Sequence, residues 1–388
     1  MNTATGYLPD RSRPAWFGIA LSTLFVATIV VALAGSLRAP RPVNPFENRT
    51  VEPLPPIPAS MRALREYPAR FEHFFDDRFG MRNALVHFDH WTRAMVFGVS
   101  PVPKVLLGQS GWLYFTGEDA KAFDRWYRGS EPVSDAAIAT TRDELVRRAA
   151  FLDGRGIPFV VVIVPEKYTV YPEFLPDWAS ARTARAPLDR LADELAAQPQ
   201  LHFVDLRGPL SRSKASERLY YKTDSHWNYL GASVGYAQIM REVARLLAAS
   251  TIAPVVRPPY IAGVDYYSGD LTQMLGLPRQ FREEDIAPLG KILATPQARC
   301  AKQEPSVAAN IETFVYRCPD PPRYSALVYR DSMGIPLMPM LAENFARTTF
   351  VTSAQLDPQQ VDALKPAIVI EEMVERASVS PAFYPMPR

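Results

Sequence analysis

The amino-acid sequence predicts an α/β fold in which a doubly wound parallel sheet lies between layers of helices. Segments such as IPFVVVIVP and SALVYR are continuous apolar runs rich in β-branched residues, as expected for strands that are buried on both faces. Amphipathic helical segments separate these runs, and strands that alternate with helices typically form a parallel sheet. The chain of 388 residues is long enough to bury a large core.

The expected helices and strands follow one another from Ser134 onward. The segment SDAAIATTRDELVRRAAFLDGRG has a Ser/Asp start, amphipathic spacing and a Gly stop, which together indicate a helix. It leads into IPFVVVIVP, after which the pattern repeats as a helix near 184–198, the strand LHFVDL, a helix near 228–249, the strand SALVYR, a helix near 334–345, the strand TTFVTS, a helix near 357–364 and the strand AIVIEE. Residues 255–324, rich in proline and tyrosine, are expected to form an inserted, loop-rich segment.

Residues 16–37 are expected to form a transmembrane signal anchor. They contain no charged residue, and arginines flank them on both sides. At ~1.5 Å per residue, a helix of this length spans a hydrocarbon core of about 30 Å. Because Arg11 and Arg13 favour a cytoplasmic start, residues 1–15 are expected in the cytoplasm, and the remainder is expected in the periplasm, anchored to the inner membrane. A cleaved signal peptide is the alternative, since Ala32-Leu33-Ala34 resembles a cleavage site.

The chain beyond the expected anchor divides into a tether and a body. Residues 38–59 are dense in proline and are expected to form an extended tether. Residues 60–388 form the expected periplasmic domain. Its first part, residues 60–97, has aromatic and aliphatic residues at helical spacing and is expected to be mostly helical. The alternating segment VLLGQSGWLYF is expected to form a hairpin around Gln109 to Gly111.

Charge and cysteine content limit the classes of partner and compartment. The chain has 43 basic and 41 acidic residues and a net charge of +2, and it shows no basic stripe interleaved with aromatic residues. Nucleic acid is therefore not expected as a partner. Cys300 and Cys318 fit an oxidising compartment, where one disulfide would stabilise the fold by about 3 kcal/mol. Two unlinked buried cysteines are the alternative.

Polar residues that directly follow strands are the candidate site residues, because ligands of parallel α/β sheets bind at the carboxyl ends of the strands. Ser332 follows SALVYR where a helix would begin, which would expose its hydroxyl group. A nucleophilic serine needs a base, and His226 is the best placed histidine, in a polar segment ahead of an expected helix. Asp224, two residues before it, would orient the imidazole.

Each of these residues also has a purely structural interpretation. Asp331 and Ser332 form an ordinary helix N-cap sequence, and Asp224 and His226 could hydrogen-bond within a turn. A metal site at Asp224 and His226 is the least favoured alternative, because no third ligand occurs at a recognised spacing. The same holds for a metal site at the helical pair His87 and His90. Neither a metal nor another cofactor is expected.

Eight motifs occur in one order along the body of the chain: ENR, FEHFFDDRFGMRN, GQSGWLYF, VPEKYTVYP, TDSHWNYLGA, YSGDLTQML, YRDSM and VIEEMVER. Together they resemble the alginate O-acetyltransferase family, the AlgJ/AlgX group of the SGNH-hydrolase superfamily. Carried over residue by residue, the resemblance implies that TDSHW supplies Asp224 and His226 and that YRDSM supplies Ser332. Asp and His precede Ser, the reverse of the usual SGNH order, which implies a permuted arrangement of the same sheet.

The resemblance also places further residues at the site. The oxyanion donors would be the Ser332 backbone N–H and a side chain of the turn at Lys167 and Tyr168. Trp227 would serve as a packed lid or as a platform for a sugar ring, and Arg330 would lie beside the substrate. The serine motif here has Asp before the serine, where relatives often have Gly or Thr.

The activity that the resemblance implies is transfer of an acetyl group, through a Ser332 acyl-enzyme, onto hydroxyls of an exopolysaccharide such as alginate. Because the periplasm lacks acetyl-CoA, a membrane-bound O-acyltransferase would supply the acetyl group, and other polysaccharide secretion proteins would be partners. A carbohydrate acetylesterase with the same triad and a non-catalytic scaffold of a secretion complex are the alternatives. Since the sequence ends soon after Arg376, no carbohydrate-binding module is expected.

Overall fold

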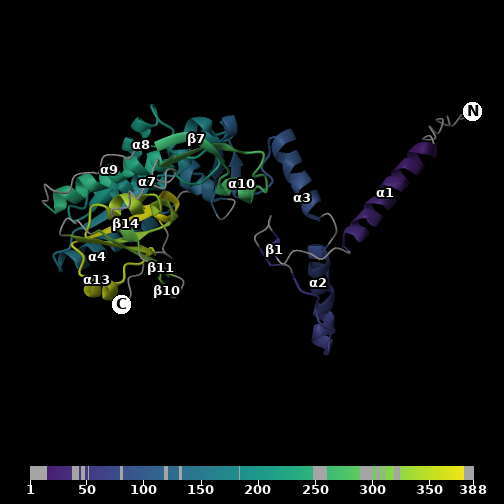
Figure 1. Cartoon of the computed structure of the whole chain (residues 1–388), viewed down its shortest axis with the longest axis horizontal. Helices are drawn as coiled ribbons and strands as arrows, with labels where there is room; N and C mark the ends of the chain where they lie inside the picture. Colours follow the sequence, from purple (N-terminus) through teal and green to yellow (C-terminus); the bar gives the residue numbers. More distant parts are fainter. Residues whose placement is uncertain are drawn as a thin grey trace, which may run out of the picture. The chain divides into compact units, whose positions relative to one another are not determined.

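A computed structural model gives the fold of the chain, which divides into two compact units, Met1–Phe97 and Gly98–Arg388 (Figure 1). All strands of the predicted sheet belong to the second unit. The residues that the structure describes are 15–36, 43–44, 49–50, 52–78, 82–117, 121–130, 133–182, 184–247, 260–288, 300–302, 306–308, 311–318 and 324–379.

The first unit is mostly helical. Its elements are α1 (Ala15–Ser36), the short antiparallel pair β1 (Val43–Asn44) and β2 (Arg49–Thr50), α2 (Met61–Arg78), α3 (Arg82–Trp91) and the π-helix η1 (Thr92–Val96). The prediction of helices over residues 60–97 is therefore confirmed. Those helices belong to the first unit, and the second unit begins at Gly98.

The structure does not support the predicted membrane anchor, residues 16–37. These residues do form a helix, α1, but within the described part of the chain no helix is both long and apolar enough to cross a membrane. Residues 1–14 lie outside the described residues, and the predicted tether, residues 38–59, is described only in part.

The second unit is built on one sheet with a parallel core. The core has the strand order β13-β12-β14-β5-β6, and it consists of β5 (Phe159–Val164), β6 (His202–Asp205), β12 (Ser325–Arg330), β13 (Arg347–Thr352) and β14 (Ile368–Val374). Every residue of β5 and β14 is buried. This agrees with the continuous apolar sequence of β5, whereas β14 also buries the carboxyl groups of Glu371 and Glu372. The five predicted strands of the core are therefore confirmed.

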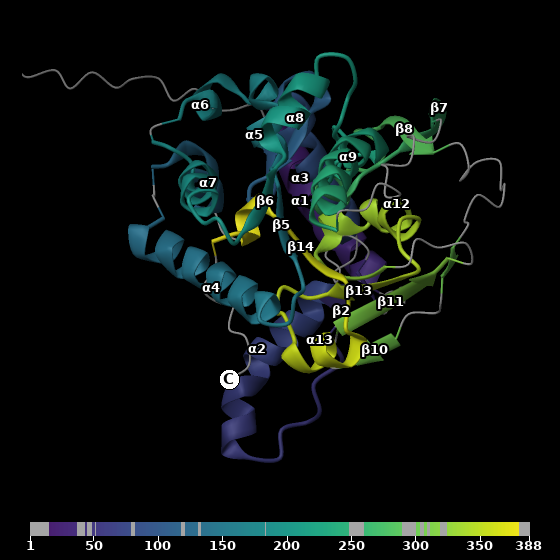
Figure 2. The ribbon, with the colours of Figure 1, turned by 90° about the vertical axis from the view of Figure 1, so that its left-hand side faces the viewer.

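Helices cover both faces of this sheet, as a doubly wound fold requires (Figure 2). The pair α4 and α7 packs on one face, and α9 and α12 pack on the other. These helices and the remaining ones are α4 (Asp135–Asp153), α5 (Lys167–Val170), α6 (Asp177–Ser180), α7 (Pro187–Ala196), α8 (Arg207–Ser213), α9 (Tyr229–Leu246), α12 (Leu337–Ala342) and α13 (Pro358–Leu364). The predicted hairpin is also present, as β3 (Val105–Leu107) paired with β4 (Leu113–Phe115).

Residues 255–324 contain more regular structure than the sequence predicted. Their described part includes β7 (Tyr260–Tyr267), α10 (Asp270–Met274), β8 (Glu283–Pro288), β9 (Ala301–Lys302), β10 (Ser306–Ala308) and β11 (Ile311–Arg317). Strand β11 pairs antiparallel with β13 and carries β9 and β10 at the edge of the sheet. The prediction of a wholly parallel sheet is therefore wrong. The sheet is mixed, because an exposed edge can accept an antiparallel strand that needs only one buried face.

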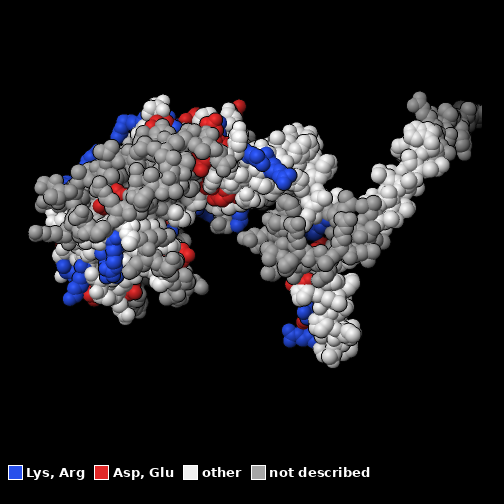
Figure 3. All heavy atoms as spheres, in the orientation of Figure 1, with Lys and Arg blue, Asp and Glu red and all other residues white. Residues whose placement is uncertain are grey.

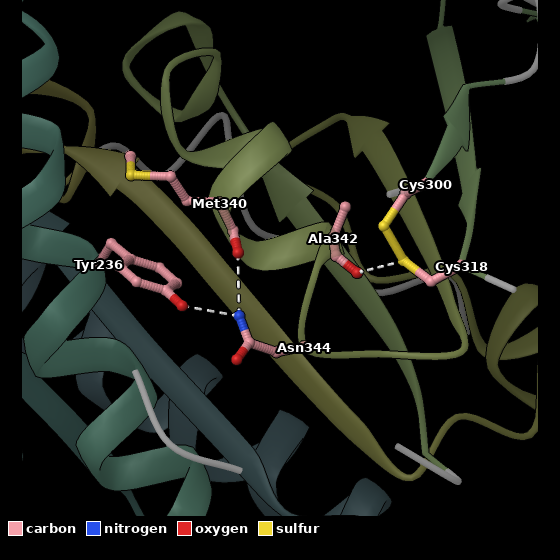
Figure 4. Close-up of a disulfide and its surroundings, with 6 residues drawn as sticks. All are labelled: Tyr236, Cys300, Cys318, Met340, Ala342 and Asn344. Atoms are coloured by element: carbon pink, nitrogen blue, oxygen red, sulfur yellow. Dashed lines mark hydrogen bonds between the residues drawn. A yellow bond between two sulfur atoms is a disulfide. The ribbon is translucent and has the colours of Figure 1, made fainter. Parts of the chain in front are cut away.

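The predicted disulfide between Cys300 and Cys318 is present (Figure 4). Both cysteines are buried, and the Cys318 sulfur lies 3.0 Å from the carbonyl oxygen of Ala342 at the end of α12. Beside it, the side-chain amide of Asn344 donates to Tyr236 on α9 and to the Met340 carbonyl. The disulfide thus links the residues before β9 and after β11 at the edge of the sheet, and Cys318 contacts the end of α12, the helix that follows Ser332.

A buried ion pair joins helix α4 to strand β14 of the sheet. Arg148 of α4 is fully buried and donates to the carboxylate of Glu371 in β14 at 2.6 Å. It also donates to the carbonyl oxygen of Ala354 and the carboxylate of Glu144. Burial raises the pKa of Glu371, and the charge of Arg148 opposes that rise. Helix α4 is therefore held to the strand next to β12.

Replacing Arg148 by Met should lower the free energy of unfolding by about 3–5 kcal/mol, because the Glu371 carboxylate would be left buried without its partner. The matched control is Arg147→Met on the same helix, where the arginine is 47% exposed and pairs with Glu144, so a change of about 0.5 kcal/mol is expected. Urea denaturation followed by circular dichroism measures both. Equal losses in the two variants would contradict this assignment.

Candidate active site

The sheet brings Ser332, His226 and Asp224 together at the carboxyl end of its strands. Ser332 opens a short 3-10 helix, η5 (Ser332–Gly334), directly after β12. Asp331 caps this turn, since its carboxylate accepts from the Met333 N–H at 2.8 Å. Asp224 and His226 lie in the loop that leads into α9. The side chain of Asp224 is buried, His226 is 28% exposed and Ser332 is exposed, so the three run from the interior to the surface.

The three side chains form one chain of hydrogen bonds. His226 Nε2 lies 2.9 Å from Ser332 Oγ, and His226 Nδ1 lies 2.6 Å from Asp224 Oδ1. An ionised carboxylate can only accept, so Nδ1 carries the ring proton and Nε2 is left to accept from the serine hydroxyl. A nucleophile, a base and a group that orients the base require this geometry.

Asp224 is held by donors other than His226. Its Oδ1 accepts from the His226 backbone N–H at 2.9 Å, and its Oδ2 accepts from the Tyr267 hydroxyl at 2.5 Å and from the Asp270 N–H at 3.0 Å. Burial alone would raise the pKa of Asp224, but the hydrogen bonds and charge of His226, with the Tyr267 hydroxyl, lower it. The carboxylate is therefore ionised at neutral pH.

His226 faces a second carboxylate, that of Asp270. Asp270 Oδ2 lies 3.8 Å from His226 Nδ1, and the Ser225 hydroxyl donates to the same carboxylate at 2.5 Å. Burial lowers the pKa of His226, yet Asp224 and then Asp270 outweigh burial and raise it. Asp270 and Tyr267 were not among the predicted site residues, although both lie in the motif YSGDLTQML. They reach the site because β7 and α10 fold back against the histidine loop.

Within the described part of the chain, Asp224, His226 and Asp270 form a group that could hold a metal ion, because their ligand atoms all lie within 4.8 Å of one another. In this structure both ring nitrogens of His226 lie within hydrogen-bonding distance of protein groups. Both oxygens of Asp224 likewise accept protein donors. In this structure, therefore, these side chains form hydrogen bonds with protein groups. The other histidine pair considered as a metal site, His87 and His90, belongs to the first unit, whereas Asp224, His226 and Asp270 belong to the second.

The resemblance implied an oxyanion donor in the turn of Lys167 and Tyr168, but the ammonium group of Lys167 faces backbone carbonyl oxygens. Its ammonium group is buried and donates to the carbonyl oxygens of Tyr221, Lys222 and Asp224, at 2.9, 3.0 and 2.6 Å. These bonds use all three of its protons. Burial lowers the pKa of Lys167 to about 8. Lys167 therefore shapes the loop that carries Asp224.

The other predicted contact residues are also buried. Tyr168 packs against Phe123 and Tyr127. Trp227 is fully buried, so its ring offers no exposed face to a sugar, and its indole N–H donates to the Met333 carbonyl at 2.8 Å. Arg330 is 4% exposed and donates to the Asp331 carbonyl. Trp227 and Arg330 thus contact the turn that carries Ser332, whereas Tyr168 belongs to an aromatic cluster.

Arg376 is a site residue that the sequence analysis did not assign. It lies in η6 (Glu375–Ala377), directly after β14, and forms an ion pair with Glu166. Its side chain is 27% exposed, and its positive charge acts on both His226 and Asp331. The predicted strand ended at AIVIEE, whereas β14 continues to Val374. Had the strand been predicted to end at Val374, Arg376 would have been among the polar residues that follow a strand and would have been a candidate.

The ring of His226 should titrate above its ordinary pKa of 6.5, because Asp224 and Asp270 favour the imidazolium form. In Asp224→Asn the nearer anion is gone, burial prevails, and the pKa should fall below that value. Two-dimensional NMR of the imidazole signals measures both titrations. His202, whose pKa burial lowers, is the internal reference and should not move. An unchanged His226 titration in Asp224→Asn would disprove the coupling.

Comparison with known proteins identifies the family. A profile of the SGNH hydrolase-like domain of the acetyltransferase AlgX matches residues 105–304. The chain is 27% identical over 254 residues to a probable alginate O-acetylase AlgJ of Azotobacter vinelandii, a match that covers 63% of this chain and 59% of that protein. It is 31% identical over 182 residues to a probable alginate O-acetylase AlgJ of Pseudomonas syringae, covering 45% of this chain and 42% of that protein.

Among solved structures, Bacillus cereus PatB1 has the same fold, with a TM-score of 0.51 and 15% identity over 72% of this chain and 98% of that one. The matches to the two AlgJ proteins span less than two thirds of their length. The profile covers more than half of this chain and includes Asp224 and His226. The chain therefore belongs to the AlgX family of SGNH hydrolase-like acetyltransferase domains.

Proposed function

We propose that this protein is an O-acetyltransferase that carries the acetyl group on Ser332 and passes it to a hydroxyl group of an exopolysaccharide. The observation that supports this proposal best is the line of hydrogen bonds from Ser332 Oγ through His226 to Asp224. The alginate O-acetylase names of the two AlgJ relatives support the type of reaction and the class of acceptor.

In the first half of the reaction Ser332 Oγ attacks the carbonyl carbon of the acetyl donor, and His226 Nε2 takes the hydroxyl proton. The carbonyl oxygen becomes an oxyanion, and Asp224 stabilises the imidazolium ion that forms. The Ser332 backbone N–H is the proposed oxyanion donor, and the positive charge of Arg376 favours the developing negative charge. The C–O bond to the donor then breaks, the leaving oxygen takes the proton from Nε2, and acetyl-Ser332 remains.

In the second half a sugar hydroxyl replaces the donor. His226 Nε2 removes its proton as the sugar oxygen attacks the acetyl carbon, and the Ser332 ester bond breaks. The serine oxygen recovers the proton from the imidazolium, so the enzyme returns to its starting state. If water attacks instead, the product is acetate, and the protein is an acetylesterase. The two activities differ only in which hydroxyl reaches the acyl-enzyme.

The proposed place of action is the periplasm. The Cys300–Cys318 disulfide supports this location, because such bonds persist in oxidising compartments. Acetyl-CoA is absent there, so the proposed donor is a membrane-bound O-acyltransferase that acts as a partner. The acceptor would be alginate or another exopolysaccharide, delivered by other polysaccharide secretion proteins.

Ser332→Ala and His226→Ala should each reduce acetyl transfer by at least about 10³-fold, because the nucleophile and its base act as a unit. The assay supplies the full chain with a chromogenic acetyl ester and an oligosaccharide, and mass spectrometry detects the acetylated sugar. Ser213→Ala on α8 is the matched control and should be as active as the unchanged protein. Circular dichroism verifies that every variant is folded.

The products decide between the proposed activity and its alternatives. Acetylated sugar that disappears in Ser332→Ala supports transfer through the acyl-enzyme. Acetate alone, at the same rate with and without oligosaccharide, identifies an acetylesterase. No turnover of any acetyl ester by the folded, unchanged chain, together with normal polymer acetylation in cells that carry Ser332→Ala, identifies a scaffold. Either of the last two results overturns the proposal.

A further inference from the structure

A cavity of about 740 Å³ lies at the carboxyl end of β6, and no step of the proposed reaction uses it. Its volume falls in the range of small-molecule sites, roughly 300–1,000 Å³. The residues of its wall that matter here are Tyr127, Thr169, Arg182, Asp189, Asp205 and Arg207. They come from segments far apart in the sequence and meet only in the folded second unit.

The cavity and Ser332 share one edge of the sheet. Asp205 ends β6, Thr169 follows β5, and Ser332 follows β12. The strand order β12-β14-β5-β6 separates the serine from the cavity by three strand spacings, which amount to about 14 Å at ~4.8 Å each. Arg376 follows β14, between the two places. A polymer that lies along this edge would reach Ser332 with one residue and the cavity with another.

The charged side chains of the cavity neutralise one another. Arg207 donates to Asp205 through Nη2 at 2.7 Å and forms a second ion pair with Asp189. Arg182 Nη1 lies 3.6 Å from the other oxygen of Asp189. Two arginines thus face two aspartates, and the wall carries no net charge.

An aromatic ring supports one side of the cavity. The guanidinium carbon of Arg182 lies 4.6 Å from the ring centroid of Tyr127, and the Tyr127 hydroxyl donates to the Ser180 carbonyl. Stacking on the ring and pairing with Asp189 restrict the guanidinium plane before any ligand arrives. A ligand therefore meets donors and acceptors whose positions are already fixed, and it loses less free energy in ordering them.

We propose that this cavity is a subsite for a neutral sugar residue of the acceptor polysaccharide, a few residues along the polymer from the hydroxyl that Ser332 acetylates. This inference rests on the proposed function and limits its acceptor to an exopolysaccharide that contains neutral sugar residues, which excludes alginate because every residue of alginate is a uronate. Sugar hydroxyls both donate and accept, so they can bond to the aspartate oxygens and to the arginine N–H groups without breaking the ion pairs. A uronate carboxylate would compete with Asp189 for Arg182 and Arg207 and would be repelled by Asp205.

Binding to the full chain carrying Ser332→Ala tests the subsite without turnover. The probes are neutral gluco-, manno- and galacto-hexasaccharides and a mannuronate hexasaccharide, and calorimetry measures each Kd. At least one neutral probe should bind about tenfold or more tightly than the uronate. Adding Arg182→Ala should weaken that binding about tenfold, because hydrogen bonds from a charged donor are lost. Adding Ser180→Trp, from an exposed position at the cavity, should fill the space and abolish binding.

Arg245→Ala is the matched control, since Arg245 is exposed and pairs with Glu242 beside His202, at the opposite end of β6. It should leave every Kd unchanged. Ser180 and Arg182 are both exposed, so either substitution should leave the protein folded. Thermal unfolding verifies this for each variant. If one variant is not folded, the Kd values of the other decide. Tighter binding of the uronate, no binding of any neutral probe, or equal Kd values with and without the cavity substitutions would overturn the subsite. Persistent acetylation by Ser332→Ala would instead overturn the proposed function and leave this binding result standing.

Discussion

The geometry of the site depends on one buried ammonium group. The loop before α9 has little regular structure, so its carbonyl oxygens need donors from elsewhere, and Lys167 provides three at once. Glu283 of β8 complements it from the other side by accepting from the N–H groups of Lys222 and Thr223. A cation from the end of β5 and an anion from a distant strand thus fix the loop, and with it Asp224 and His226.

A second layer of contacts joins this loop to the serine turn. The Trp227 indole binds the Met333 carbonyl, one residue after Ser332. On the other side of the turn, the buried carboxyl group of Glu372 accepts from the Asp331 N–H, and burial raises the pKa of Glu372 well above its ordinary value. Gly334 fits only because it has no side chain, since a Cβ there would lie 2.6 Å from Glu372 Oε2. The separation of 2.9 Å between His226 Nε2 and Ser332 Oγ is maintained because both sides are supported from behind.

The sequence alone was enough to predict the core strands and to select Asp224, His226 and Ser332 as candidates, and the reason is physical. Burial on both faces leaves a readable apolar run in β5 and in the first three residues of β14, and strand ends gather polar residues at one edge. The function of Lys167 was not readable, because its partners are main-chain carbonyls, which leave no pattern in a sequence. Asp270 and the antiparallel strand β11 were also missed, because tertiary packing places them and local periodicity does not.

The disulfide makes one edge of the molecule sensitive to redox conditions. Disulfides persist in oxidising surroundings and are reduced where glutathione or thioredoxin is active. Reduction of Cys300–Cys318 would remove the covalent link at the edge of the sheet, beside the end of α12, where the Cys318 sulfur lies 3.0 Å from the Ala342 carbonyl oxygen. The packing of the layer that follows Ser332 therefore depends on the oxidants around the protein as well as on its sequence.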